Sequence, residues 1–343
     1  MRHKTFLVFI LPSLIVMVLF IALPIVSVAY QSLFIEHEQV MTAVETCDPF
    51  SCVTEMRVDA AVMQDLRDRE PMGKFNGLDT YGNSSHLALS AVAQIWRDAP
   101  TFGAAVAGMM NLPLYKALAF TLAYTFIVTP LVIIVGFFIA LGVNSIPGLI
   151  KGPVIFFSLL PMIVTPLIGS LVLFWMIDSN GILGSSLQRL TGNPDLTLKA
   201  SPTLTWTVLM IYGVWHSAPF SFIVFYAGLQ GVPKDTLESA MIDGASRWER
   251  VRYVISPHLI PLTIFIALMQ LMDNFRVLEP IVGFSASANA TSLSYLIYSD
   301  LRGSETPLFG SAGATSMLTI LGVVILLLPV LIRTSRDFNR KSH

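Results

Sequence analysis

Six long apolar segments, separated by polar stretches, dominate the hydrophobic pattern of this chain. They cover residues 6–30, 117–143, 154–177, 204–229, 259–283 and 308–332. Each is long enough to cross the hydrocarbon core of a bilayer as a helix, which takes about 20 residues. Lipid offers no hydrogen-bond partners to the backbone, so the pattern predicts six transmembrane helices and an all-α, polytopic membrane protein.

Composition supports this class. Hydrophobic residues make up 54% of the chain and charged residues only 13%, with a net charge of −1. Soluble domains carry about 25% charged residues, and a balanced charge argues against nucleic acid as a partner. The first apolar segment exceeds the roughly 7–15 residues of a signal-peptide core. We therefore expect residues 1–30 to form a retained N-terminal transmembrane helix.

The distribution of Lys and Arg predicts the orientation of the chain. These residues are denser in the segments that would be cytoplasmic if the N-terminus lies inside, as the positive-inside rule requires. Both termini, including the tail 334–343, are then expected in the cytoplasm. The same orientation places the polar loop 234–257 on the cytoplasmic side.

The segment 31–112 is too long for a simple connection between two spans. Its acidic residues outnumber its basic residues, and 58–70 and 88–96 have the pattern of short amphipathic helices. We expect a small external subdomain here, with an unstructured insertion as the alternative.

Within this loop, Cys47 and Cys52 are predicted to form a disulfide if the loop is exported. Such a short closed loop would stabilise the fold by roughly 2 kcal/mol. Two free thiols are the alternative, and a metal site is not expected because His37 is the only nearby histidine.

The loop 234–257 is the only long run of mixed charge among the later spans. A helix is expected to begin near residue 234, with Asp235 as its cap and Glu238 in its first turn, where a carboxylate complements the helix dipole. Gly244 should permit a tight turn. Asp243 and Arg247 have the i, i+4 spacing of an ion pair.

The order of residues in this loop resembles the EAA loop of binding-protein-dependent ABC importer permeases. The residues that carry the resemblance are Glu238, Ala240, Asp243, Gly244, Ala245, Arg247 and, at the expected start of the next span, Pro257. The resemblance implies the type I ABC importer fold over residues 113–333. It also implies that the loop is a rigid coupling element that sits in a cleft of an ATPase subunit.

Other elements resemble the carbohydrate branch of this family, the maltose and glycerol-phosphate type. Residues 75–81 read FNGLDTY, similar to the family element F-x-G-L-x-N-Y, and residues 11–13 read LPS in the first helix. Residues 281–286 depart from the family pattern, which leaves the solute class open. The chain ends RTSRDFNRKSH without glycine, similar to the subunit type that lacks a glycine-rich C-terminal tail.

The resemblance implies a permease that moves a sugar, polyol or glycoside from a periplasmic binding protein into the cytoplasm by alternating access. It further implies a bacterial inner-membrane location, a heterodimer with a second permease subunit, and two copies of an ABC ATPase. The chain lacks a GxxxxGK[ST] phosphate-binding motif. We therefore expect no enzymatic activity and no cofactor in this chain, with ATP and Mg on the partner ATPase.

Polar residues inside the spans are the candidate substrate contacts, because polar groups in a bilayer are costly unless paired or wet. They are Gln270, Asp273, Asn274 and Arg276 in the fifth span and Trp215 and Tyr226 in the fourth. Asp273, Arg276 and Glu279 step by three and are expected to neutralise one another, either as a structural network or as the ion site of a secondary transporter driven by an ion gradient. A non-transporting receptor or scaffold is a further alternative.

Overall fold

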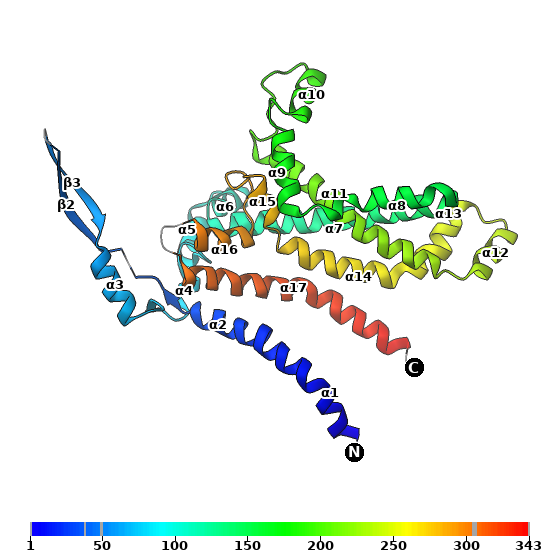
Figure 1. Cartoon of the computed structure of the whole chain (residues 1–343), viewed down its shortest axis with the longest axis horizontal. Helices are drawn as coiled ribbons and strands as arrows, with labels where there is room; N and C mark the ends of the chain where they lie inside the picture. Colours follow the sequence, from blue (N-terminus) through cyan, green and yellow to red (C-terminus); the bar gives the residue numbers. More distant parts are fainter. Residues whose placement is uncertain (1, 38, 49–50, 304–306, 342–343) are drawn as a thin grey trace. The chain divides into compact units, whose positions relative to one another are not determined.

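The computed structural model describes residues 2–37, 39–48, 51–303 and 307–341, and most of them are helical (Figure 1). The chain divides into two compact units. Unit 1 consists of Met1–Lys116 and Leu296–Leu321, and unit 2 of Ala117–Tyr295 and Gly322–His343. Three helices contribute to both units: α7 (Pro113–Ser145), α16 (Leu293–Arg302) and α17 (Phe309–Lys341).

Among the described residues, five helices are long and apolar enough to cross a membrane, and a bent pair of helices can supply a sixth span. The five are Phe9–Gln31, Pro113–Ser145, Pro202–Gln230, Arg247–Phe275 and Phe309–Ile332. The prediction of a mostly helical membrane protein is therefore confirmed. The third and fifth predicted segments, however, take a different course from the one expected.

The first and fifth spans accommodate a proline in the same way. In the first, α1 (Arg2–Met17) and α2 (Leu23–Gln31) are joined by a π turn, Val18–Ala22, two residues before Pro24. In the fifth, the π turn Val251–Ile255 ends two residues before Pro257. Proline has no N–H to donate, so a single wider turn absorbs the lost bond without ending the helix. Pro257 lies in the first turn of the α-helix Ser256–Phe275, and the π turn before it makes the helix continuous with the preceding residues.

The third predicted span, 154–177, is broken rather than continuous. Helices α8 (Gly148–Ile163) and α9 (Pro166–Met176) meet at an angle of 91°. Val164 and Thr165 between them have ψ angles of 126° and 144°, which are extended values. A residue that precedes proline is disfavoured in the helical region, so Pro166 explains why the helix stops here.

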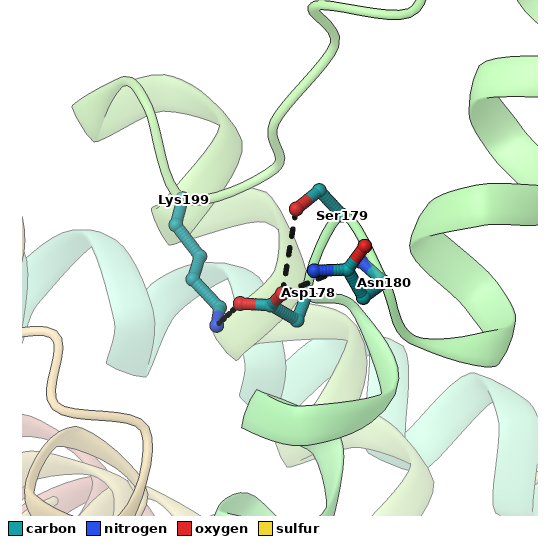
Figure 2. A network of polar contacts seen from close by, with 4 residues as sticks. All are labelled: Asp178, Ser179, Asn180 and Lys199. Carbon is teal, nitrogen blue, oxygen red and sulfur yellow. Dashed lines mark hydrogen bonds and ion pairs between the residues drawn. The ribbon is translucent and has the colours of Figure 1, made fainter.

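The connection from α9 to α11 (Pro202–Gln230) is held by one cluster of polar contacts (Figure 2). It contains the short helix α10 (Ile182–Thr191). The Lys199 Nζ donates to Asp178 Oδ2 over 2.9 Å and lies 3.3 Å from the centre of the Phe174 ring. The hydrogen bond from Lys199, with a further one from the Asn180 backbone, lowers the pKa of Asp178. The ion pair therefore joins the two ends of the connection.

The fifth span also ends earlier than predicted. Helix α14 (Ser256–Phe275) stops at Phe275, and a separate short helix, α15 (Glu279–Gly283), follows. Leu278 between them has a φ of −134° and a ψ of −59°, outside the regular helix. Pro280, whose ring cannot extend the preceding helix, lies at the start of α15.

Helices α9 and α15, which follow the two breaks, pack closely against each other. The Ser170 Oγ donates to the carbonyl of Leu167 over 2.9 Å and lies 3.4 Å from the carbonyl of Glu279. A Cβ at Gly283 would lie only 2.2 Å from the Ser170 Oγ and 2.6 Å from the Leu167 carbonyl oxygen. Only glycine therefore permits this approach.

In unit 1, the loop 31–112 is folded. The two predicted helices are present as α3 (Ala60–Arg69) and α5 (Leu89–Asp98), and the loop also holds α4 (Asp79–Gly82) and α6 (Phe102–Met109). Polar contacts join it to the start of α17. The backbone N–H of Gly310 donates to Glu36 Oε1 over 2.8 Å, and the buried His86 bonds through Nε2 to the Ser311 carbonyl over 3.1 Å.

Two small antiparallel pairs of strands add to the helices that the sequence predicted. β1 (Phe34–Ile35) pairs with β4 (Lys74–Phe75), and β2 (Met41–Asp48) pairs with β3 (Ser51–Val58). The backbones of Cys47 and Cys52 are direct partners in the second pair. Their side chains lie outside the described part of the chain, so the disulfide and the free thiols both stay as predictions.

The packing of α9 on α15 makes a testable prediction. Gly283→Ala places a methyl group against backbone atoms that cannot move aside, so we expect a loss of about 1–3 kcal/mol in stability. The check is the thermal unfolding midpoint of the detergent-solubilised protein. Gly142→Ala is the matched control, since a Cβ at Gly142 in α7 meets no atom within 4 Å. Equal midpoints for the two variants would contradict the proposed close packing.

Candidate functional site

A cavity of about 500 Å³ lies in unit 2 between helices α7, α9, α11 and the break that separates α14 from α15. Both broken spans therefore contribute to its wall. Its polar lining residues are Tyr124, Tyr212, His216, Ser217, Asp273, Asn274, Arg276, Glu279 and Ser294. Asn274, Asp273 and Arg276 were predicted as substrate contacts, and the structure brings these three to one cavity.

Two side chains of α11 hold the break in the third span. The His216 Nε2 donates to the carbonyl of Val164 over 3.0 Å. One turn earlier, the Tyr212 hydroxyl donates to the carbonyl of Pro166 over 2.9 Å. Backbone carbonyls released from a helix inside a membrane need such substitute donors. Tyr212 and His216 therefore fix the position where α9 leaves α8.

Tyr212 and Tyr124 also pass close to glycines. A Cβ at Gly169 of α9 would lie 2.3 Å from the Tyr212 Oη, and a Cβ at Gly213 would lie 2.1 Å from the Tyr124 Oη. The two tyrosines were not among the predicted site residues. The spacing of Tyr212 and His216, one helical turn apart in a segment that follows a proline-rich span, was the available clue.

At the second break, Arg276 pairs with Asp273. The Arg276 Nη2 lies 3.1 Å from Asp273 Oδ1, and each side chain is 56% exposed in this single chain. Within the described residues, no ion pair joins Glu279 to Arg276. The predicted neutralisation among all three is therefore wrong. The helix ends at Phe275, so the spacing by three no longer places Glu279 on the same face.

The other candidate contacts divide between packing and the cavity. Gln270 and Asn274 share the buried face that their spacing predicts, at 4% and 5% exposure. The Asn274 Nδ2 donates to Thr129 Oγ1 over 3.0 Å and also lines the cavity. Gln270 does not line it, and its Oε1 is buried without a hydrogen-bond partner. Gln270 therefore belongs to the helix packing, at an energetic cost.

The two aromatic candidates of the fourth span lie elsewhere. Trp215 lines a separate cavity of about 500 Å³ with almost entirely apolar walls, between α9, α10 and α11. Tyr226 packs against Phe222 at a ring separation of 5.9 Å, and the Lys151 Nζ lies 6.0 Å from its centre. Neither residue reaches the polar cavity. Within the described residues, no group of His, Cys, Asp and Glu is placed to hold a metal ion.

The second candidate site is the loop 234–257. It consists of α12 (Lys234–Ile242), a turn, and α13 (Arg247–Arg250), which continues into the fifth span. Gly244 has a φ of +80°, the left-handed value that glycine adopts without strain. The tight turn predicted at Gly244 is therefore confirmed, and it separates two rigid helical arms.

Three local expectations in this loop are wrong. Pro233 is the N-cap of α12 and provides no side-chain bond, so Asp235 lies inside the first turn and Glu238 in the second. The described contacts hold no ion pair between Asp243 and Arg247, because α12 ends at Ile242 and the helical spacing is lost.

Instead, the second arm begins with a capping box. The Ser246 N–H donates to Glu249 Oε2 over 2.7 Å, and the Glu249 N–H donates to Ser246 Oγ over 3.3 Å. The S-x-x-E pattern of Ser246 and Glu249 could have been recognised in the sequence.

Large apolar side chains are exposed beside the predicted coupling residues. Ile242 is 86% exposed and Trp248 60%, and Met241 and Tyr253 are also exposed. Glu238, Asp243, Gly244, Arg247 and Pro257 are exposed, whereas Ala240 and Ala245 are half-buried. We call the exposed surface formed by Glu238, Met241, Ile242, Gly244 and Trp248 the coupling surface. Apolar side chains in a polar loop are typical of a surface that another protein covers.

Comparison with known proteins assigns the family. Residues 99–335 match the model of the family described as "Binding-protein-dependent transport system inner membrane component". The chain belongs to this family. The match includes both the polar cavity and the coupling surface, and the resemblance seen in the sequence is confirmed.

Curated relatives agree with this assignment. The permease is 28% identical over 211 residues to the trehalose/maltose transport system permease protein MalF of Thermococcus litoralis, covering 60% of this chain and 69% of that one. It is 25% identical over 214 residues to the sn-glycerol-3-phosphate transport system permease protein UgpA of Yersinia pestis, covering 60% of this chain and 71% of that one.

A solved structure shares the fold of the permease. It is the crystal structure of a bacterial ABC transporter involved in the import of the acidic polysaccharide alginate. The TM-score is 0.59 at 19% sequence identity, covering 73% of this chain and 90% of that chain. The helical arrangement described above is therefore that of ABC importer permeases.

The break in the third span makes the second prediction. His216→Phe removes the donor to the Val164 carbonyl, and Tyr212→Phe removes the donor to Pro166, so each should destabilise the permease by about 1 kcal/mol. Thermal unfolding in detergent is the measurement. Trp215→Phe, on the same helix but outside both bonds, is the control. Midpoints that match the control for both variants would show that the two bonds do not hold the break.

Proposed function

We propose that this permease is one subunit of an ATP-driven ABC importer that moves a sugar or sugar-like solute into the cytoplasm by alternating access. The observation that carries the proposal is the polar cavity at the two broken spans, on the same chain as an exposed coupling surface. Family membership supports the transport role. Relatives named for trehalose, maltose and glycerol phosphate support the solute class.

The chemistry of the cavity suits a polyhydroxylated solute. Its volume of about 500 Å³ falls within the range of roughly 300–1,000 Å³ for small-molecule sites. Asn274 offers an amide, Tyr124 and Tyr212 offer phenol groups, and the Asp273–Arg276 pair offers both charges. Phenol rings can also stack on the apolar faces of a sugar, so the site combines hydroxyl recognition with stacking.

Partners follow from the coupling surface and the family. We propose that an ABC ATPase, present in two copies, covers the coupling surface, and that ATP and Mg bind there rather than to this chain. A second permease subunit would complete the transport path as a heterodimer. A periplasmic solute-binding protein would deliver the solute; a complex with such a protein is known for the alginate transporter. The chain would lie in a bacterial inner membrane with both termini in the cytoplasm.

The geometry of the loop supports a lever. Two helical arms meet at Gly244, and the second arm is continuous with the fifth span to Phe275. A force on α13 would therefore reach Asp273 through a helix that is continuous from Arg247 to Phe275. The capping box at Ser246 and Glu249 keeps the start of that helix from fraying.

A secondary transporter is the second candidate, supported by the Asp273–Arg276 pair that faces the cavity. The two functions differ in their energy source. Uptake by proteoliposomes that contain the complete transporter should require ATP on the side of the membrane where the ATPase lies. An ionophore that collapses the ion gradients should not stop this uptake. Uptake that persists without ATP and stops with the ionophore would establish the secondary transporter instead. Normal uptake in cells that lack the chain would favour a receptor or scaffold.

The coupling surface makes the third prediction. Glu238→Arg reverses a charge on that surface, and Gly244→Trp adds bulk while straining the left-handed turn by about 1–2 kcal/mol. Each should abolish most uptake and solute-stimulated ATP hydrolysis while the permease still inserts. Gly192→Trp is the control, because Gly192 also has a left-handed φ of +66° and open surroundings but ends α10. Normal uptake by either coupling variant would refute the assignment.

The cavity makes the fourth prediction. Arg276→Ala leaves Asp273 without its ionic partner and removes a donor to the solute, so apparent affinity for the solute should fall about 10-fold, equivalent to about 1.4 kcal/mol. The measurement is the solute concentration at half-maximal uptake. Arg189→Ala, an exposed cation in α10 outside the cavity, is the control. An unchanged affinity in the Arg276 variant would exclude this residue from solute binding.

A further inference from the structure

Helices α5 and α6 in unit 1 form a hairpin with an exposed apolar face. On α5, the apolar side chains Leu89, Val92 and Trp96 follow the helical spacing and share one side. Ser90, Gln94 and Arg97 share the opposite side. Such a division between two faces is typical of a helix that lies between an apolar and an aqueous environment.

The two helices pack through small and aromatic contacts. A Cβ at Gly108 of α6 would lie 2.8 Å from the Ile95 Cγ2, so Ile95 faces α6. The rings of Trp96 and Phe102 meet edge to face at 5.8 Å. This packing still leaves Leu89 61%, Trp96 47% and Phe102 74% exposed. We call these three residues the hairpin patch.

The hairpin is held at the ends of the membrane spans. The Tyr115 hydroxyl, at the start of α7, donates over 2.9 Å to the carbonyl of Leu87, two residues before α5. His86 bonds to the carbonyl of Ser311 near the start of α17. Helix α6 ends at Met109, and α7 begins at Pro113, so this connection spans at most about 14 Å. Both α7 and α17 are candidate spans.

We propose that the α5–α6 hairpin lies in the interfacial layer of the bilayer, with the hairpin patch inserted among the lipids. The short tethers hold the hairpin at the depth where two spans begin, which is the headgroup region. Tryptophan and other aromatic residues favour that region because they combine apolar rings with a polar edge. The polar face with Gln94 and Arg97 is turned to the headgroups and water, as in interfacial amphipathic helices.

Lipid fits the hairpin patch better than a protein partner does. In the same unit, the first candidate span also exposes apolar side chains near its C-terminal end, with Val26 at 67% and Tyr30 at 53%. Helix α5 also precedes residue 99, where the match to the family begins. The hairpin would thus anchor the folded loop 31–112 to the membrane surface. The inference depends on the spans alone and does not depend on the solute.

Paired spin labels test the proposal. Trp96→Cys on the patch and Gln94→Cys on the polar face are labelled in a Cys47→Ser, Cys52→Ser background. The complete transporter, with its co-purified partners, is reconstituted in phosphatidylcholine–phosphatidylglycerol vesicles. We expect the label at 96 to be several-fold more accessible to oxygen, which concentrates in lipid, than to a water-soluble nickel chelate. The label at 94 should show the reverse order.

Other outcomes would overturn the proposal. Access of the nickel chelate to both positions would place the patch in water, and exclusion of both probes from position 96 would mean that a protein covers it.

If the cysteine-free background does not fold, the wild-type protein and Trp96→Phe can be compared in vesicles of brominated phosphatidylcholine. The bromine-quenched share of the fluorescence should fall in Trp96→Phe, and an unchanged share would refute insertion. Neither readout needs transport, so failure here is distinct from failure of the proposed function.

Discussion

Every backbone carbonyl inside a bilayer needs a hydrogen-bond donor, and this constraint governs the places where the spans of this permease can bend. The break between α8 and α9 exists because Pro166 prevents a continuous helix, and it persists because His216 and Tyr212 donate to the Val164 and Pro166 carbonyls. Before two other prolines the chain shows a milder distortion. The π turns before Pro24 and Pro257 widen one turn and leave the span intact.

The polar cavity lies where the two spans are broken, so the same residues shape both features. Ending α14 at Phe275 turns Asp273 and Arg276 toward the open space between helices, where their charges can pair. Tyr212 serves both features, since it holds α9 and lines the cavity. Tyr212 is therefore a cavity residue that also sets helix geometry. In the proposed function, a solute that contacts Tyr212 would act on α9 and, through the contacts of Ser170 and Gly283, on α15.

The coupling surface and the cavity are connected by one helical rod. From Arg247 to Phe275 the helix is uninterrupted apart from its π turn, so the end beside the coupling surface and the end that lines the cavity belong to one continuous element. Gly244 isolates this rod from α12, because a left-handed turn lets two rigid arms meet at a sharp angle. A rigid rod with a defined corner is what mechanical coupling across a membrane requires.

The sequence alone determined the membrane class, the positions of the first, second, fourth and sixth spans, the turn at Gly244 and the family. Each depends on composition, periodicity or a local motif, because the interactions that decide these features join residues close together in the sequence. It also predicted α3 and α5, whose amphipathic patterns are local in the same sense. The pairing of β1 with β4 went unforeseen, since it joins residues about forty positions apart.

Only the tertiary structure decided which polar residues share a cavity. Proline positions suggested bends but not their size: the break before Pro166 is held by donors from α11, whereas a π turn inside a continuous helix precedes Pro257. Gln270 and Asn274 have equivalent positions in the pattern, yet only Asn274 reaches the cavity. Glu279 left the predicted charge cluster once the helix ended at Phe275. These outcomes rest on contacts between segments far apart in the chain, which no local pattern encodes.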